Sequence, residues 1–221
     1  KKPDTNLNER DADQVQRTYK HYRSKLLKVY ADLRVGATHR EKFAYRTGKE
    51  ILFTFDDYGT KKQVLDLLKA LDTCNAKAMF FVQGSWSDKN ADLVKRIVNA
   101  GHIVGNHTYN HLDLTSLDEQ TLHAEITRGV QSEWLRPPMG KYNKSVRKAI
   151  HAQNMKIVYW TVDSDDWQGV SGDYMKHKIL RQIHPGAVIL FHMHCNKTIQ
   201  ALPAIAQAIR ARGYEFEPII K

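Results

Sequence analysis

Short apolar runs alternate with amphipathic segments along most of the chain. Seven runs have the length and composition of buried strands. They are ILFTF, AMFFV, HIVGN, EWLRP, KIVYWTV, AVILFH and YEFEPII. The segments between them carry apolar residues at helical spacing, as at Val64, Leu67 and Leu71. Strands alternating with helices indicate an α/β fold with parallel strands, and a β/α barrel or an open doubly wound sheet would fit.

Two helix starts carry a capping signal. Thr60 with Gln63 and Ser116 with Glu119 both have the spacing of a capping box. We therefore expect one helix to begin after Thr60 and another after Ser116.

The pattern differs before residue 46. Apolar residues there recur every three or four positions, which is typical of a long amphipathic helix. They are Val15, Tyr19, Tyr22, Leu26, Tyr30 and Leu33. We expect an N-terminal helical extension over residues 1–45 and one α/β domain over residues 46–221.

Composition limits the classes of partner. Among 221 residues, 34 Lys and Arg oppose 24 Asp and Glu, and the net charge of +10 favours polyanions. The basic residues are scattered and form no nucleic-acid-binding motif, so sequence-specific nucleic-acid binding is not expected. No apolar run approaches the roughly 18 residues of a membrane span. The chain starts KKPDTN without a signal-peptide pattern, which suggests a mature or trimmed piece. Cys74 and Cys195 can be free thiols or a disulfide.

The first strand runs directly into two carboxylates, Asp56 and Asp57. Successive strand side chains point to opposite faces, so both can reach one site only where the strand ends and Tyr58-Gly59 lets the backbone turn. Adjacent carboxylates repel each other, and a bound cation would relieve that repulsion. The alternative is that Asp56 caps a helix and Asp57 is solvated.

The third strand ends in GNHTYNH, which places His107 and His111 four residues apart. This spacing brings two imidazoles to one face of a helical turn. Two imidazoles and one carboxylate are typical of a catalytic metal site with open positions. An HxxxH pair by itself is often fortuitous.

Three further strand ends carry polar groups. Each has an ordinary structural explanation, but five polar strand ends together favour a catalytic rim. These groups are Arg136 in LRPPMG, Asp163, Asp166 and Trp167 in WTVDSDDW, and His192 and His194 in VILFHMH.

Together these residues resemble the polysaccharide deacetylase family, the NodB-homology domain of carbohydrate esterase family 4. Five motifs stand in the family's order over residues 51 to about 215: TFDDYG, HTYNH, RPPMG, DSDDW and LFH. The resemblance implies a distorted (β/α)7-type barrel, in agreement with the seven runs. Residues 1–45 lie outside it.

The resemblance implies a divalent-metal site formed by Asp57, His107 and His111. The metal is usually zinc in this family, and cobalt or other divalent ions are accepted by some members.

The resemblance also implies the acid and base groups. Asp56 would be the general base, held by Arg136. His192 would be the general acid, with Asp163 as its carboxylate partner, and the Met139 backbone N–H would stabilise the oxyanion. His194 is interpreted as a rim residue.

Substrate contacts follow from the same motifs. Trp167 would wall the acetyl pocket. Tyr58 stands where the family often has glycine, and Met139 stands where an aromatic residue is usual, so a sugar-stacking ring would have to come from Trp86, Tyr109 or Trp160. The implied substrate-binding residues are Tyr58, Pro137, Met139, Gly140, Trp167 and Leu190.

The implied function is a metal-dependent hydrolase that releases acetate from a β-linked N-acetylglucosamine polymer. Peptidoglycan is the first candidate and a chitin-type oligosaccharide the second. The alternatives are an O-acetyl esterase on xylan-type glycan and a non-catalytic carbohydrate-binding protein on the same scaffold. We expect a monomer that acts outside the cell or at the cell wall.

Overall fold

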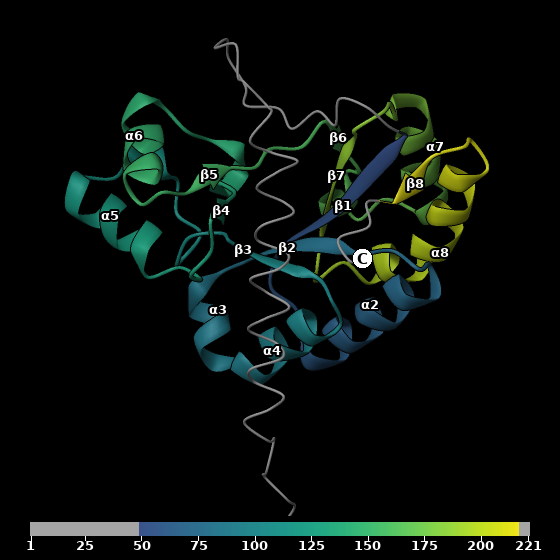
Figure 1. Ribbon diagram of the computed structural model, residues 1–221, viewed down its shortest axis with the longest axis horizontal. Coiled ribbons are helices and arrows are strands. Elements are labelled where there is room, and N and C mark those ends of the chain that lie inside the picture. Colours follow the sequence, from purple (N-terminus) through teal and green to yellow (C-terminus); the bar gives the residue numbers. More distant parts are fainter. Residues whose placement is uncertain (1–48, 217–221) are drawn as a thin grey trace, which may run out of the picture.

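The computed structural model describes residues 49–216 (Figure 1). The predicted helix within residues 1–45, the predicted boundary at 45/46 and the end of the YEFEPII run lie outside these residues and stay predictions. Within the described part, no helix combines the length and apolar character needed to cross a bilayer.

Strands and helices alternate along the described chain, as the apolar pattern predicts. The strands are β1 (Glu50–Asp57), β2 (Ala78–Val82), β3 (Ile103–Asn106), β4 (Trp134–Leu135), β5 (Lys156–Ile157), β6 (Val162–Asp163), β7 (Val188–His192) and β8 (Glu215–Phe216). The α-helices are α2 (Lys61–Thr73), α3 (Gly84–Lys89), α4 (Ala91–Asn99), α5 (Glu119–Thr127), α6 (Lys144–Ala152), α7 (Gly172–Gln182) and α8 (Asn196–Arg210). Short 3-10 turns η1 (Leu114–Ser116), η2 (Pro138–Gly140) and η3 (Asp166–Gln168) lie between them.

The strands form one parallel sheet in the order β5-β4-β3-β2-β1-β7-β6, and β8 pairs with the start of β1. The sheet curls into a half-barrel with helices around it (Figure 1), which confirms the predicted α/β fold of the distorted β/α-barrel type. Helices α5 and α6 lie on the side of β4 and β5, whereas α7 and α8 lie on the side of β6 and β8.

The run KIVYWTV is two strands instead of the predicted one. Its start, β5, pairs with β4, and its end, β6, pairs with β7 at the opposite end of the sheet order. The residues between them bridge these two ends. Val158 N–H donates to the Leu135 carbonyl, and Thr161 N–H donates to the Val188 carbonyl. An apolar run identifies a buried segment, but it does not show where that segment stops pairing with one strand and starts pairing with another.

Alternation along β1 separates the two faces of the sheet. Phe53 and Phe55 pack with α2, α7 and α8 in the larger core cluster, and Phe55 stacks between Phe80 and Phe191. Leu52 instead joins a smaller cluster on the other face. Burying each such apolar side chain contributes about 1.5–3 kcal/mol. The same alternation places Asp56 on the face opposite Phe55.

Capping confirms one predicted helix start and corrects the other. Thr60 and Gln63 form a full capping box at α2. Helix α5 begins at Glu119, but its cap is Asp118, whose side chain accepts the Thr121 N–H at 2.9 Å. Ser116 instead is the last residue of the 3-10 turn η1, which follows the cap residue Asp113.

Candidate active site

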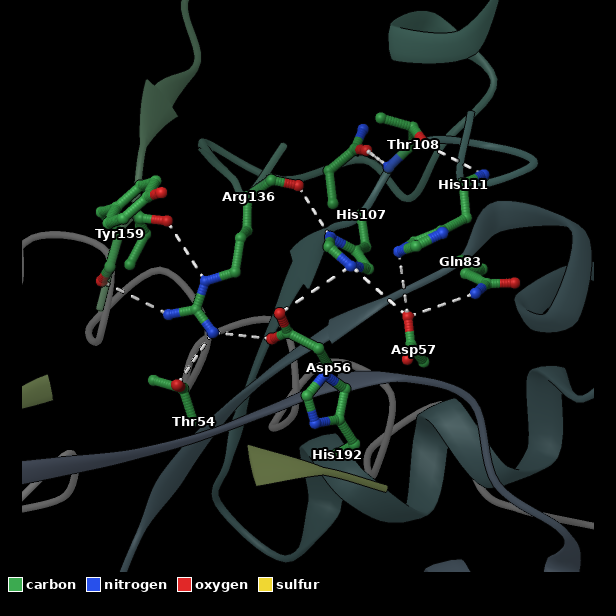
Figure 2. A network of polar contacts seen from close by, with 12 residues as sticks. Thr54, Asp56, Asp57, Gln83, His107, Thr108, His111, Arg136, Tyr159 and His192 are labelled. Atoms are coloured by element: carbon green, nitrogen blue, oxygen red, sulfur yellow. Dashed lines mark hydrogen bonds and ion pairs between the residues drawn. The ribbon is translucent and has the colours of Figure 1, made fainter. Parts of the chain in front are cut away.

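The polar strand ends meet at the carboxyl-terminal edge of the curled sheet. They surround a cavity of about 350 Å³, near the lower end of the range for ligand pockets. Figure 2 shows Asp56 between Arg136 on one side and the imidazoles on the other. The cavity is lined by Asp56, Asp57, His107, His111, Met139, Trp160, Asp163, Trp167, Leu190 and His192.

The two adjacent carboxylates reach one site because the backbone turns at Asp57. Asp57 has a left-handed φ of 77°, whereas Gly59, where the sequence suggested the turn, has no positive φ. This conformation is uncommon for a residue with a side chain. It directs Asp57 towards the histidines while Asp56 keeps its strand orientation towards Arg136.

The HxxxH pair lies on an irregular loop, not on the helical turn that the spacing suggested. Thr108 and His111 both have left-handed backbones, with φ of 62° and 61°. The His111 N–H donates to Thr108 Oγ1 at 3.2 Å. The centres of the two imidazole rings lie 4.9 Å apart. The loop therefore brings the two histidines together, as a helical turn would.

Two buried polar residues that sequence reasoning missed hold this loop. Asn106 Oδ1 accepts the Thr108 N–H at 2.7 Å, and its amide donates to the Ile126 carbonyl at 2.9 Å. The Glu125 carboxylate accepts the backbone and side-chain amides of Asn110 at 2.8 and 2.7 Å. In the sequence, Glu125 could have been noticed only as a charged residue beside the core position Ile126, on a helix face that is otherwise apolar.

Asp57, His107 and His111 fit a divalent metal ion. One ligand atom from each lies within 4.8 Å of the others. His107 Nδ1 lies 2.7 Å from the Arg136 carbonyl and therefore carries the proton, which leaves Nε2 free as a ligand. Nε2 of His107 and of His111 lie 3.5 and 3.3 Å from Asp57 Oδ1. Two imidazoles and one carboxylate form a donor set that suits zinc and leaves coordination positions open.

The charge of Asp57 is favoured by its neighbours. Burial opposes ionisation, but the hydrogen bond with His107 and the nearby imidazoles outweigh burial and lower the pKa of Asp57. The carboxylate is therefore available as an anionic ligand at neutral pH.

Arg136 is fully buried and holds Asp56, as the sequence predicts. Its Nη1 donates to Asp56 Oδ1 at 2.7 Å and to Thr54 Oγ1 at 2.9 Å. The guanidinium also lies 4.3 Å from the centre of the Phe81 ring. Burial lowers the pKa of Arg136, while Asp56 opposes that shift. Thr54, which lies two residues before Asp56 on the same face, was not foreseen.

The carboxylate beside His192 is Asp166, which corrects the predicted pairing with Asp163. Asp166 Oδ1 lies 2.7 Å from His192 Nδ1, and Oδ2 accepts the His192 N–H at 2.8 Å. Thr198 donates to the same Oδ2 at 2.7 Å. Asp163 instead accepts the Asp165 N–H at 2.8 Å, although it lines the cavity. The left-handed backbone of Asp165, with φ of 59°, reverses the chain and brings Asp166 back to His192.

The pairing with Asp166 keeps His192 charged. Burial lowers the pKa of His192, but the hydrogen bond to Asp166 and the charges of Asp166, Asp56 and Asp57 outweigh it and raise that pKa to about 9. Burial raises the pKa of Asp163.

Apolar side chains wall the cavity. Met139, Trp167 and Leu190 line it, and Met139 and Trp167 are largely exposed at 48% and 59%. Trp160 supplies the additional ring, whereas Trp86 and Tyr109 do not line the cavity. Such a wall suits a small apolar group or the face of a sugar ring.

Three of the predicted substrate-binding residues, Tyr58, Pro137 and Gly140, do not line the cavity. Gly140 has a left-handed φ of 66°, and a Cβ there would lie 2.3 Å from Tyr159 Oη. The glycine therefore permits close packing under the Met139 turn.

Comparisons with known proteins find related sequences and structures. The sequence model of the family described as polysaccharide deacetylase matches residues 44–158. A peptidoglycan-N-acetylglucosamine deacetylase of Bacillus cereus is 34% identical over 194 residues, which cover 80% of this chain and 70% of that protein.

Two solved structures are similar as well. One is the Bc1960 peptidoglycan N-acetylglucosamine deacetylase, with a TM-score of 0.74 and 32% identity over 79% of this chain and 87% of that one. The other is a carbohydrate esterase family 4 pseudoenzyme from Bacillus anthracis, with a TM-score of 0.72 and 27% identity over 80% of this chain and 64% of that one. The same scaffold therefore occurs in an enzyme and in a pseudoenzyme.

Proposed function

The chain belongs to the polysaccharide deacetylase family, and on this premise we propose that it is a metal-dependent hydrolase of N-acetyl groups on peptidoglycan. The observation that carries the proposal is the cavity in which three metal-type ligands face a buried Asp–Arg pair and a charged histidine. Asp56 and His192, the base and the acid of this proposal, line that cavity together with the three ligands.

Asp57, His107 and His111 hold the divalent ion in this proposal, with zinc as the first candidate and cobalt as an alternative. When bound, the ion supplies Lewis-acid polarisation of the carbonyl and lowers the pKa of water.

Asp56 acts as the general base. Its Oδ1 is occupied by Arg136, whereas Oδ2 lies on the side of the histidines, 3.8 Å from His107 Nε2. Oδ2 is therefore the oxygen that takes the proton from the attacking water. Arg136 fixes the orientation of the carboxylate because it is itself held by Thr54 and by the Val158 carbonyl.

His192 acts as the general acid. Its Nδ1 is committed to Asp166, so Nε2 delivers the proton to the departing amine. The raised pKa of about 9 keeps the ring charged at neutral pH, before the proton is needed. Asp166 thus takes the role that the sequence assigned to Asp163.

The remaining contacts hold the substrate. The Met139 N–H stabilises the oxyanion that develops on the acetamide carbonyl, and the left-handed turn at Met139 places this residue at the cavity. Trp160, Trp167 and Leu190 enclose the acetyl group and one sugar ring.

Peptidoglycan is the first substrate and a chitin-type oligosaccharide the second, with action at the cell wall or outside the cell. The named relatives and the net charge of +10, which attracts an anionic wall, support this order. A non-catalytic carbohydrate-binding role is the second candidate, because a pseudoenzyme shares the scaffold.

Acetate release tests the proposal. Chelator-stripped protein is incubated with N-acetylglucosamine oligomers or purified peptidoglycan, with and without zinc or cobalt, and Asp56→Asn is the blank. We expect metal-dependent acetate from the wild type and none from Asp56→Asn. Metal-loaded protein that releases acetate only from acetylated xylan would establish an O-acetyl esterase. Glycan binding without acetate from any substrate would establish the binding role.

A further inference from the structure

In the described part of the chain, His194 carries a polar atom without a partner beside Asp57, His107 and His111, which are called the metal-type cluster below. Its Nδ1 is buried and has no hydrogen-bond partner within residues 49–216. Asp57 Oδ2 lies 3.8 Å away, beyond hydrogen-bond range. Buried polar nitrogens without partners are rare because each one loses its hydrogen bonds to water. The position of this atom therefore needs an explanation.

The segment that carries His194 is fixed to neighbouring elements. The Met193 N–H donates to the Asp56 carbonyl at 3.0 Å, and Gln63 of α2 donates to the His194 carbonyl at 2.8 Å. The ring stacks on Tyr58, with centres 5.4 Å apart and planes 22° apart. These contacts hold the imidazole beside Asp57.

Asp57 has two differently used oxygens. Oδ1 lies 3.3 Å from His111 Nε2 and accepts a hydrogen bond from Gln83 at 3.3 Å. Oδ2 lies towards His194 instead. Both imidazole Nε2 atoms lie close to Oδ1, so Oδ1 would be the oxygen that faces the ion, and Oδ2 would be left for a neighbouring donor to orient.

We propose that His194 is a positioning residue for the metal ligand Asp57. Through an N–H at Nδ1, it donates a hydrogen bond to Asp57 Oδ2 and fixes the plane of the carboxylate. The proposal requires these two atoms, 3.8 Å apart in the structure, to approach to hydrogen-bond distance. His194 is not itself a ligand, because it lies outside the group of mutually close ligand atoms formed by Asp57, His107 and His111. The inference rests on the metal site of the proposed function and adds a residue to it.

The test measures metal affinity without substrate. Zinc and cobalt dissociation constants are determined by competition with a chromophoric chelator for the wild type, His194→Asn and His194→Leu. Asn places an amide donor near the position of Nδ1, whereas Leu has nearly the same size and no donor. We expect His194→Leu to bind zinc roughly 10- to 100-fold more weakly, the range found for partners of metal ligands, and His194→Asn to stay within a few-fold of wild type. His194→Phe, which keeps a ring against Tyr58, should behave as Leu does.

Several results would overturn the inference. Equal affinities for Leu and wild type, or equal losses for Asn and Leu, would show that the donor is irrelevant. Loss of one nitrogen ligand from the bound metal in His194→Leu, measured by X-ray absorption, would make His194 a direct ligand. Wild-type protein that binds no metal would remove both the inference and the proposed function. Wild-type binding that is insensitive to His194 would remove the inference alone.

Discussion

At the scale of single residues, backbone conformation decides which carboxylate faces the metal-type cluster and which one contacts His192. Asp57 turns into the metal-type cluster because its φ is 77°, and Asp166 reaches His192 because Asp165 has a φ of 59°. Residue type and spacing in DSDDW do not reveal which aspartate follows the reversal. The carboxylate partner of His192 was therefore predicted wrongly.

The Asp166–His192 pair predicts a pH dependence of stability in the metal-free protein. The pKa of His192 rises from 6.5 to about 9 on folding. The stabilisation that this shift adds to the free energy of unfolding is therefore fully present below pH 6.5 and is lost as the pH rises through 9. The loss is on the order of 3 kcal/mol. We expect Asp166→Asn to reduce this fall. Urea unfolding in chelator at pH 6 and pH 9.5 measures it.

Asp163→Asn is the matched control for that measurement, because Asp163 acts on His192 through its charge and not through a hydrogen bond. It should retain most of the wild-type fall between the two pH values. A fall that is equal in wild type and Asp166→Asn would contradict the assignment of Asp166.

The buried pair Arg136–Asp56 predicts strong coupling in stability. Arg136→Met leaves the Asp56 carboxylate buried without its partner, which we expect to lower the free energy of unfolding by roughly 3–5 kcal/mol. Asp56→Asn removes the charge and should recover part of that loss in the double variant. Urea unfolding of the two single variants and the double variant gives the coupling energy. Additive losses would mean that the pair does not interact in solution.

At the scale of elements, the 107–111 loop shows how a sequence motif and a backbone can differ. The HxxxH spacing identified the two histidines, yet the loop reaches their geometry through left-handed residues and buried hydrogen bonds instead of a helical turn. Spacing predicts which residues can meet, whereas the supporting contacts come from Asn106 in β3 and Glu125 in α5, which are not part of the HxxxH pattern. Glu125 could not be identified from the motif.

We therefore predict that Glu125 affects metal binding although it is not one of the three ligands. Glu125→Ala leaves both Asn110 amides without their acceptor, so the loop loosens and metal affinity should fall, by roughly 10-fold or more. Chelator competition measures the affinity. Glu119→Ala, an exposed change on the same helix, should bind metal as the wild type does. Equal affinity in Glu125→Ala and Glu119→Ala would mean that the loop holds its shape without Glu125.

At the scale of the whole molecule, alternating apolar runs predicted the parallel α/β fold and the edge at which the site forms. This worked because parallel strands all present their carboxyl ends at one edge. The run KIVYWTV was misread because its two ends pair with β4 and β7, and only the curled shape of the sheet shows that change of partner. The region before residue 46 stays a prediction.

The metal-type cluster joins distant parts of this fold, which predicts that metal binding stabilises the whole domain. Asp57 ends β1, and His107 and His111 follow β3, so their ligand atoms converge only in the folded chain. A ligand of the folded state at 100 times its dissociation constant adds about 2.7 kcal/mol to the free energy of unfolding. We expect zinc to raise the melting temperature of the stripped wild type and chelator to reverse the rise. His111→Ala should lose most of this effect, whereas His123→Ala, an exposed change on α5, should keep it. An equal rise in His111→Ala and wild type would place the zinc elsewhere, and no rise in the wild type would contradict the metal site.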